Sequence, residues 1–185
     1  MNKPHLYHIA VILQSLEQAK ALVEQSFAAE LPMLTLHMPQ QDFDTLAKWW
    51  ADLIAWPFLK SEQIRVAVHG KWYELPEQIV EKIKKAVNDT KEFDKHFLNL
   101  CLNYDGQEEI VDACKLMALQ VKLGRLSPEG ITKEALKENL YSSGILPPSV
   151  IISPTEQLNG FLLWDAAKAR IVVGEPEKVL KQLLS

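Results

Sequence analysis

The sequence predicts a single α/β domain over residues 1–185, with a mostly parallel, six-stranded sheet and helices on both of its faces. Short apolar runs alternate with helical patterns from one end of the chain to the other. Most interior positions of these runs are apolar, which is typical of strands covered on both faces. Regular alternation of strand and helix indicates parallel strands joined by right-handed crossovers. Because no repeat, low-complexity segment or long linker divides the 185 residues, we expect one domain.

Six apolar runs have the length and composition of strands. The first, LYHIAVIL, is not followed by a small-residue cleavage site, so we interpret it as a core strand rather than a signal peptide. The expected strands are 6–13, 33–38, 64–69, 97–103, 149–152 and 170–173. No apolar run approaches the roughly 18 residues of a membrane span. We therefore expect a cytoplasmic protein, for which peripheral association with a membrane stays open.

Helical patterns fill the segments between the strands. Asp105 is the expected N-cap of the helix after the fourth strand, where Glu108 would complete a capping box. Thr132 is the expected N-cap of the short fifth helix. The expected helices lie near 15–30, 40–56, 75–91, 105–123, 132–140, 156–168 and 175–184.

The composition argues against nucleic acid as a partner. The chain has 20 Lys and Arg against 24 Asp and Glu, a formal net charge of −4. A general nucleic-acid binder needs a basic face for phosphates, and this charge balance disfavours one. The two cysteines, Cys101 and Cys114, have no CxxC neighbour, so we expect buried, inert thiols in a reducing compartment.

Polar residues just past the strand ends are the natural site candidates, because ligands bind at the carboxyl ends of parallel strands. The candidate ligand-binding residues are Gln14, Ser15, His37, His69, Lys71, Asn103, Tyr104, Ser153, Thr155 and Glu156. His37 and His69 could meet across neighbouring strands and hold a metal with Glu156 or Asp105, but no HxxxH or HExxH spacing supports this. We therefore expect no metal site. No GxSxG pattern surrounds Ser15 or Ser153, so a serine nucleophile is not expected and no catalytic residue is assigned.

The segment KWWADLIAWPF, residues 48–58, is the most conspicuous apolar feature. Trp49, Leu53 and Trp56 share one helical face, and Trp50 widens the apolar stripe sideways. These four residues are either a helix wedged into the core or the lining of an apolar pocket or interface. Since voids are costly, we expect the tryptophans to fill any cavity beneath the helix.

Two long blocks, LNLCLNYDGQEEIVDACK and PPSVIISPTEQLNGFLLWDAAKARIVV, carry a family resemblance. The first resembles LNxxxNYGGRxEIxxAxx and the second PDLxIRTxGExRxSNFLLWQxxYxExxF, both patterns of the cis-prenyltransferases, typified by undecaprenyl diphosphate synthase. The likeness covers roughly 64–173 well and the first 60 residues poorly. It implies the same fold, a tendency to dimerise, and a chemistry in which isopentenyl diphosphate is added to an allylic diphosphate with Mg²⁺ inside an apolar tunnel.

The positions that hold Mg²⁺ and both diphosphates in the family are changed here. The first strand runs into Gln14-Ser15-Leu16-Glu17 instead of an Asp-Gly-Asn motif, and HMPQQDF replaces the family's FSxENWxRP. The family's glutamate that binds magnesium falls on Arg170, which would repel a divalent cation. Its two arginines and its serine fall on Ile152, on Gln157 or Leu158, and on Asn159 or Gly160. Glu156 and the pair Asn103-Tyr104 are retained.

The resemblance and these changes lead to three hypotheses. The first is a catalytically degenerate homologue, without Mg²⁺ or another cofactor, acting as a non-catalytic partner or scaffold subunit in a homodimer or with an intact family member. The second is a divergent prenyltransferase acting on isoprenoid diphosphates, with His37, His69 and Lys71 as replacement charges. The third is a module that binds an uncharged isoprenoid in an apolar tunnel under the tryptophan helix.

Overall fold

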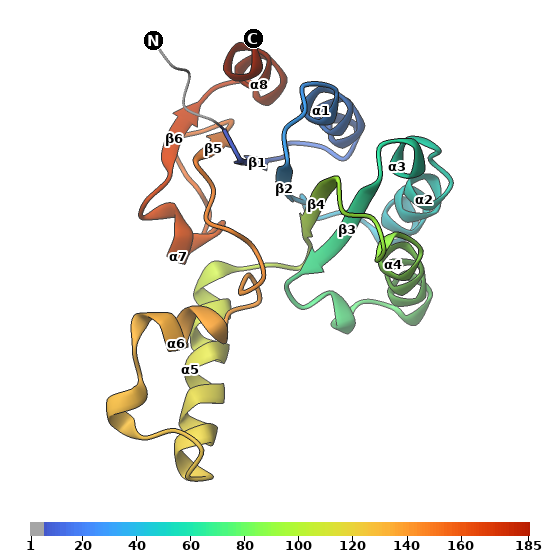
Figure 1. The fold of residues 1–185 in the computed structure, drawn as a ribbon. Helices are drawn as coiled ribbons and strands as arrows, with labels where there is room; N and C mark the ends of the chain where they lie inside the picture. Colours follow the sequence, from blue (N-terminus) through green and yellow to red (C-terminus); the bar gives the residue numbers. More distant parts are fainter. Residues whose placement is uncertain (1–5) are drawn as a thin grey trace.

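A computed structural model describes residues 6–185 and contains one six-stranded, fully parallel sheet (Figure 1). The strands lie in the order β3-β4-β2-β1-β5-β6. Their bounds are β1 His8–Ile12, β2 Met33–His37, β3 Ile64–His69, β4 His96–Cys101, β5 Val150–Ser153 and β6 Arg170–Val173. All six strands expected from the apolar runs are therefore confirmed, as is the α/β class.

Alternate residues of β1, β2, β4 and β5 enter two separate cores, as the pleat of a strand requires. Ile9 and Val11 of β1 belong to the larger core, whereas Ala10 and Ile12 belong to the smaller one. Helices α1, α2, α4 and α8 contribute to the larger core. On the other face, Ile145 and Phe161 close the smaller core.

The helices agree with most of the expected segments. Their bounds are α1 Glu17–Ala28, α2 Phe43–Ile54, α3 Phe58–Ser61, α4 Glu77–Thr90, α5 Gly106–Lys122, α6 Lys133–Glu138, α7 Leu163–Ala166 and α8 Pro176–Leu184, with 3₁₀ turns η1 Trp72–Glu74 and η2 Pro128–Gly130. Both expected N-caps are confirmed. The Asp105 carboxylate accepts hydrogen bonds from the N–H groups of Gln107 (2.7 Å) and Glu108 (3.3 Å), and the Thr132 hydroxyl accepts one from Ala135 (3.1 Å).

The helix expected at 156–168 is wrong over most of its length. Only α7 is helical, because Asn159 (φ 48°), Gly160 (φ 77°) and Leu162 (φ 45°) adopt left-handed backbone conformations that interrupt a helix. This irregular path turns Phe161 and Leu162 into the smaller core, where both are almost fully buried.

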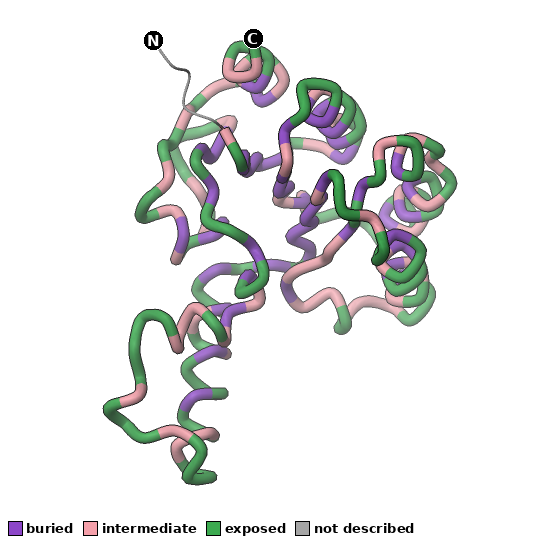
Figure 2. The backbone as a smooth tube through the Cα atoms, in the orientation of Figure 1, coloured by how far each residue is buried: buried purple, intermediate pink, exposed green. Residues whose placement is uncertain are grey.

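Helices α5 and α6 project away from the sheet as an arm (Figure 1), and most of the arm is exposed (Figure 2). Tyr104, just before α5, donates a hydrogen bond to the buried carboxylate of Glu109 (2.5 Å). Glu109 also accepts one from the backbone of Ser142 (2.7 Å), which joins the arm to the segment that covers the smaller core. Of the two cysteines, Cys101 is buried as expected, but Cys114 on α5 is exposed.

Candidate functional site

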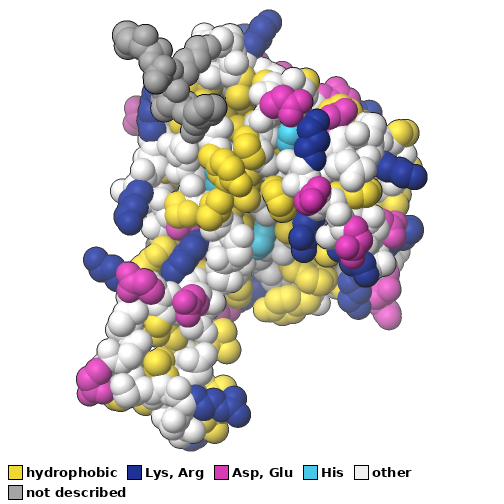
Figure 3. All heavy atoms as spheres, viewed as in Figure 1, with side chains coloured by type: hydrophobic (Ala, Val, Ile, Leu, Met, Phe, Trp, Pro, Cys, Tyr) yellow, Lys and Arg dark blue, Asp and Glu magenta, His cyan; other side chains and the backbone are white. Residues whose placement is uncertain are grey.

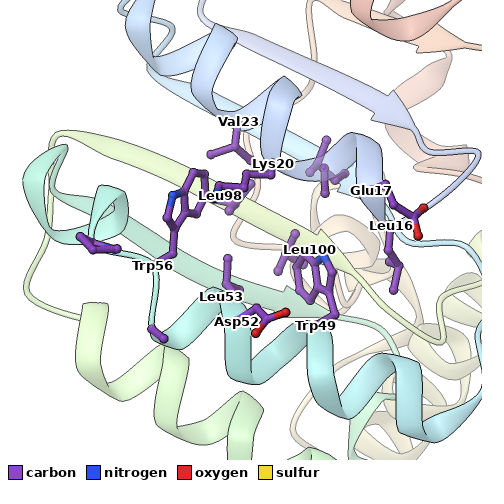
Figure 4. A pocket seen from close by; sticks show the side chains of 14 residues that line it. Leu16, Glu17, Lys20, Val23, Trp49, Asp52, Leu53, Trp56, Leu98 and Leu100 are labelled. Carbon is purple, nitrogen blue, oxygen red and sulfur yellow. The ribbon is translucent and has the colours of Figure 1, made fainter.

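An apolar pocket of about 620 Å³ lies between α1 and α2 (Figure 4). Its floor is formed by Leu36 of β2 and by Leu98 and Leu100 of β4. Its walls are Leu16, Ala19, Lys20 and Val23 on the α1 side and Trp49, Asp52, Leu53, Ala55, Trp56 and Pro57 on the α2 side. The volume lies within the ~300–1,000 Å³ of typical ligand sites.

The expectation that the tryptophans fill this cavity is wrong. Trp49, Leu53 and Trp56 line the pocket as one helical face, as their spacing predicts. Trp50 does not line it; this side chain is fully buried in the larger core, where its Nε1–H has no hydrogen-bond partner. The cavity stays open because α1 packs mainly on α8 while α2 packs mainly on α4, so the two walls are held apart.

Three charged side chains contribute to the lining of this pocket. They are Glu17 and Lys20 of α1 and Asp52 of α2, two negative charges against one positive. The Lys20 ammonium lies 5.0 Å from the centre of the Trp56 ring. A hydrogen bond from Ser15 lowers the pKa of Glu17, so this carboxylate is negative at neutral pH. Sequence reasoning missed all three as pocket residues, although Glu17 and Lys20 share one face of α1.

A second hollow, also of about 620 Å³, lies at the carboxyl edge of the sheet. It brings together three of the expected site residues, His37, Asn103 and Tyr104. Its lining also includes the carboxylates Glu74, Asp105 and Glu108, and none of its described lining residues is Lys or Arg. Burial lowers the pKa of His37, against smaller opposing effects from the Tyr104 backbone and the Asp105 charge, so its imidazole is neutral at pH 7. This hollow therefore repels anions.

The nearby cation Lys71 is already paired. Its ammonium contacts Glu108 at 2.8 Å and Asp112 at 3.3 Å, and the hydrogen bond to Glu108 raises the pKa of Lys71. Asp112 in turn accepts a hydrogen bond from Tyr141, and its pKa is held low chiefly by Lys115. Lys71 thus links the end of β3 to α5. Its positive charge is balanced by these two carboxylates and is not available to attract an anionic ligand.

His37 and His69 do not meet, contrary to the metal hypothesis. Both are in register with Cys101, but on opposite sides of β4, so their backbones are two strand spacings or about 10 Å apart. His69 is hydrogen-bonded to the carbonyl of Tyr141 (2.9 Å) and to Asn99 (3.3 Å). Between residues 6 and 185, no three His, Cys, Asp or Glu side chains are grouped to hold a metal ion.

The remaining candidates support their own turns. The N–H groups of Gln14 and Ser15 donate to the Gln18 side chain (2.9 and 3.3 Å). Asn103 has φ 47° and donates to the Lys71 carbonyl (3.1 Å), and the buried Tyr104 hydroxyl bonds to Glu109. The hydroxyls of Ser153 and Thr155 both donate to the Gln157 carbonyl (3.2 and 3.3 Å). Glu156 is exposed in the same turn.

Arg170 begins β6 opposite Val150, whereas Ser153 lies opposite Val173 at the other end of that strand. Arg170 is therefore at the amino edge of the sheet, about 10 Å along the strand from the Ser153 turn. The expected repulsion of a cation at the carboxyl edge by Arg170 does not follow from this position.

A sequence model of the family described as putative undecaprenyl diphosphate synthase matches residues 16–176. The chain belongs to this family. The resemblance seen in the two sequence blocks is thereby confirmed, and the match extends well into the first 60 residues. No helix among residues 6–185 has the length and apolar character needed to span a bilayer.

Curated relatives include archaeal undecaprenyl diphosphate synthases specific for geranylgeranyl diphosphate. The chain is 36% identical to the Methanocaldococcus jannaschii protein over 113 residues, 59% of this chain and 40% of that one. It is 32% identical to the Methanopyrus kandleri protein over 142 residues, 74% of this chain and 52% of that one. The chain thus spans about half the length of these relatives.

Two solved structures share the fold. Lavandulyl diphosphate synthase from Lavandula x intermedia superposes with a TM-score of 0.83 at 19% identity, covering 97% of this chain and 95% of that one. A probable undecaprenyl diphosphate synthase from Campylobacter jejuni gives 0.78 at 22% identity, covering 98% and 94%. At these identities the likeness establishes the architecture of the sheet and its helices.

Proposed function

We propose that the protein binds an uncharged isoprenoid chain in the pocket between α1 and α2 and does not condense isoprenoid diphosphates. The observation that carries this proposal is an open, apolar pocket under α2. The tryptophans of this segment were expected to fill such a cavity, and they leave it open. Leucine, valine and tryptophan side chains form most of its lining, a surface suited to hydrocarbon.

The charge of the carboxyl-edge hollow supports the second half of the proposal. A diphosphate is recognised by charge-assisted hydrogen bonds or through a metal ion. The hollow instead has Glu74, Asp105 and Glu108, and the neighbouring Lys71 is paired with Glu108 and Asp112. An anion placed there would meet three carboxylates. Among residues 6–185 these carboxylates are not grouped closely enough with one another to hold a metal ion that could bridge to a diphosphate.

Binding would be tested by titrating the protein with farnesol and geranylgeraniol while following tryptophan fluorescence. Saturable quenching is expected, and Trp49→Ala should weaken it because Trp49 lines the pocket. Trp72→Ala is the matched control, since Trp72 is also half-buried but does not line the pocket. Absence of saturable binding by the unmodified protein would refute the proposal.

Activity would be tested with labelled isopentenyl diphosphate, farnesyl diphosphate and Mg²⁺. No chain elongation above a blank without protein is expected, and calorimetric titration should detect no specific Mg²⁺ site. Elongation by the purified protein would instead establish the divergent prenyltransferase.

A second candidate function is that of a non-catalytic subunit, favoured by the exposed face of α5. Leu116 and Leu119 of this helix and Leu123 at its C-cap are each about half exposed, and hydrophobic side chains are visible among charged ones on the projecting arm (Figure 3). Such a stripe on a projecting helix suits pairing with a second copy or an intact family member.

Sedimentation of the purified chain should then show a dimer that Leu119→Glu dissociates. Tyr73→Glu is the control, because Tyr73 is also about half exposed. A wild-type monomer that captures no intact synthase would exclude this role.

A further inference from the structure

A chain of hydrogen bonds crosses four neighbouring strands on the face of the sheet opposite the pocket. From β3 through β4 and β2 to β1, its members are His69, Asn99, Thr35 and His8. His69 Nε2 lies 3.3 Å from Asn99 Oδ1, and Asn99 Nδ2 lies 3.2 Å from Thr35 Oγ1. Thr35 Oγ1 lies 2.7 Å from His8 Nε2. All of these side chains except that of His69 are buried.

Both ends of the hydrogen-bond chain reach the same segment, residues 139–149, which leads from α6 of the arm back to β5 (Figure 1). We call this segment the strap. His69 Nδ1 contacts the Tyr141 carbonyl at 2.9 Å, and His8 Nδ1 contacts the Leu146 carbonyl at 2.6 Å. The strap is therefore bound to the sheet at two points that one continuous set of hydrogen bonds connects.

The five contacts of this set have only four protons while both imidazoles are neutral. The two carbonyl oxygens can only accept. Each neutral imidazole supplies one proton, the Thr35 hydroxyl supplies one, and the Asn99 amide can donate on only one of its two sides. Turning the amide over exchanges those sides and leaves the count unchanged. One more proton, on His8 or on His69, completes all five hydrogen bonds.

We infer that His69 takes up this fifth proton and thereby fastens the strap to the sheet in a pH-dependent way. His8 stays neutral, because burial lowers its pKa to about 4 and the charge of Lys137 adds to this effect. His69 is only partly buried, and its contact with Asn99 is the longest of the five. Since histidines lose their charge between about pH 5 and 8, a rise in pH would leave two acceptors facing each other at this contact.

The charged groups around His69 balance one another. They are two cations and two carboxylates in mutual contact, Lys71, Lys115, Glu108 and Asp112. On the strap, the Tyr141 hydroxyl donates to this group through Asp112. On β4, Cys101 lies in register with His69, and burial raises the pKa of its thiol, which is therefore neutral. The proton count, rather than a net charge nearby, thus decides the state of His69.

The test follows the imidazole nitrogens of the full chain, labelled with ¹⁵N-histidine, by NMR from pH 5 to 9. Thr35→Val removes two contacts and one proton, so three contacts keep three protons once the Asn99 amide turns its donor toward His69. His69 should then lose its second proton at a pH lower by about half a unit or more, although Asn99 lies between residues 35 and 69. Thr35→Ser keeps the hydroxyl and should leave this titration unchanged.

Hydrogen exchange measures the strap itself. The amides of Ser142 and Ile145 are hydrogen-bonded, and their protection, corrected for the intrinsic rate, should fall at least about threefold between pH 6.5 and 8.5. His69→Gln should remove this pH dependence. His37→Gln is the control and should keep it, because His37 ends β2 on the same face but outside the hydrogen-bond chain.

Two outcomes would overturn the inference. One is a titration of His69 that stays the same in Thr35→Val. The other is strap protection that does not depend on pH in the unmodified protein, or that depends on it equally in His69→Gln. If Thr35→Val does not fold, the exchange experiment decides alone. Neither measurement involves a prenol, so the result is independent of the proposed function.

Discussion

His8 is fully buried in β1, between two hydrogen-bond partners. Its Nδ1 contacts the carbonyl of Leu146 at 2.6 Å and its Nε2 contacts the Thr35 hydroxyl at 2.7 Å. Because the Leu146 carbonyl can only accept, Nδ1 donates, and Nε2 of the neutral ring accepts from Thr35. Burial lowers the pKa of His8 from 6.5 to about 4, so the folded protein holds this ring neutral.

Acid should therefore destabilise the protein between pH 6.5 and 4. In this window His8 is protonated in the unfolded chain but not in the folded one. The unfolded state therefore binds more protons, and the free energy of unfolding decreases as the pH is lowered. The expected loss from His8 is about 3 kcal/mol, and His37 and His96, whose pKa values burial also lowers, add to it. Urea unfolding at pH 8, 6 and 4.5 would measure this, and His8→Gln should flatten the dependence. A stability independent of pH over this range would contradict the prediction.

Gly106 opens α5 in a place with no room for a side chain. A Cβ atom there would lie 2.1 Å from the Gly160 carbonyl oxygen and 2.9 Å from the Leu163 Cβ. Gly106→Ala should therefore lower the free energy of unfolding by about 1–3 kcal/mol, the usual cost of overpacking. Gly144→Ala is the matched control, since its Cβ would meet no atom within 4 Å. Equal stability of the two variants in denaturant titration would contradict this prediction, because it would show that the backbone at the start of α5 can move to make room for a methyl group.

Helix α2 has two apolar faces, one packed in the larger core and one lining the pocket. Trp50 is fully buried in the larger core, whereas Trp49 lines the open pocket one residue earlier. Trp50→Ala should cost about 3–5 kcal/mol of unfolding free energy, and Trp49→Ala less than about 2 kcal/mol, because truncation at a void removes fewer contacts. Chemical denaturation of both variants measures the difference. A greater loss for Trp49→Ala would indicate that the pocket wall, not the core face, holds this helix.

The elements could be predicted from the sequence where local pattern decides them. Burial on both faces makes the central strands apolar runs, and the caps at Asp105 and Thr132 are local hydrogen bonds. The helix predicted at 156–168 is wrong because the apolar residues of this segment, Phe161 and Leu162, reach the core through left-handed turns rather than a helix.

The sites were less predictable because they depend on strand order and on how far apart helices stand. The sequence does not reveal that β4 lies between the strands that end in His37 and His69. Likewise, the spacing of Trp49, Leu53 and Trp56 predicts their shared face, but not whether α1 packs against it. The contacts that hold α1 near α8, more than a hundred residues away, leave the pocket open.

At the scale of the whole molecule, the arm formed by α5 and α6 is joined to the rest of the chain mainly at its base. Polar contacts of Lys71, Tyr104 and Tyr141 with the first two turns of α5 fix it there. Beyond this base, helix α5 presents half-exposed leucines and few residues that are fully buried.

This attachment at one end implies that the molecule opens in two stages. In deuterium oxide, amide hydrogens in the distal half of α5 of the isolated chain should exchange well before those of β1, β2 and β4, whose protection reports global unfolding. A binding partner that covers the arm would slow its exchange while leaving the sheet unchanged. Uniform exchange across arm and sheet would mean that the two unfold as a single cooperative unit.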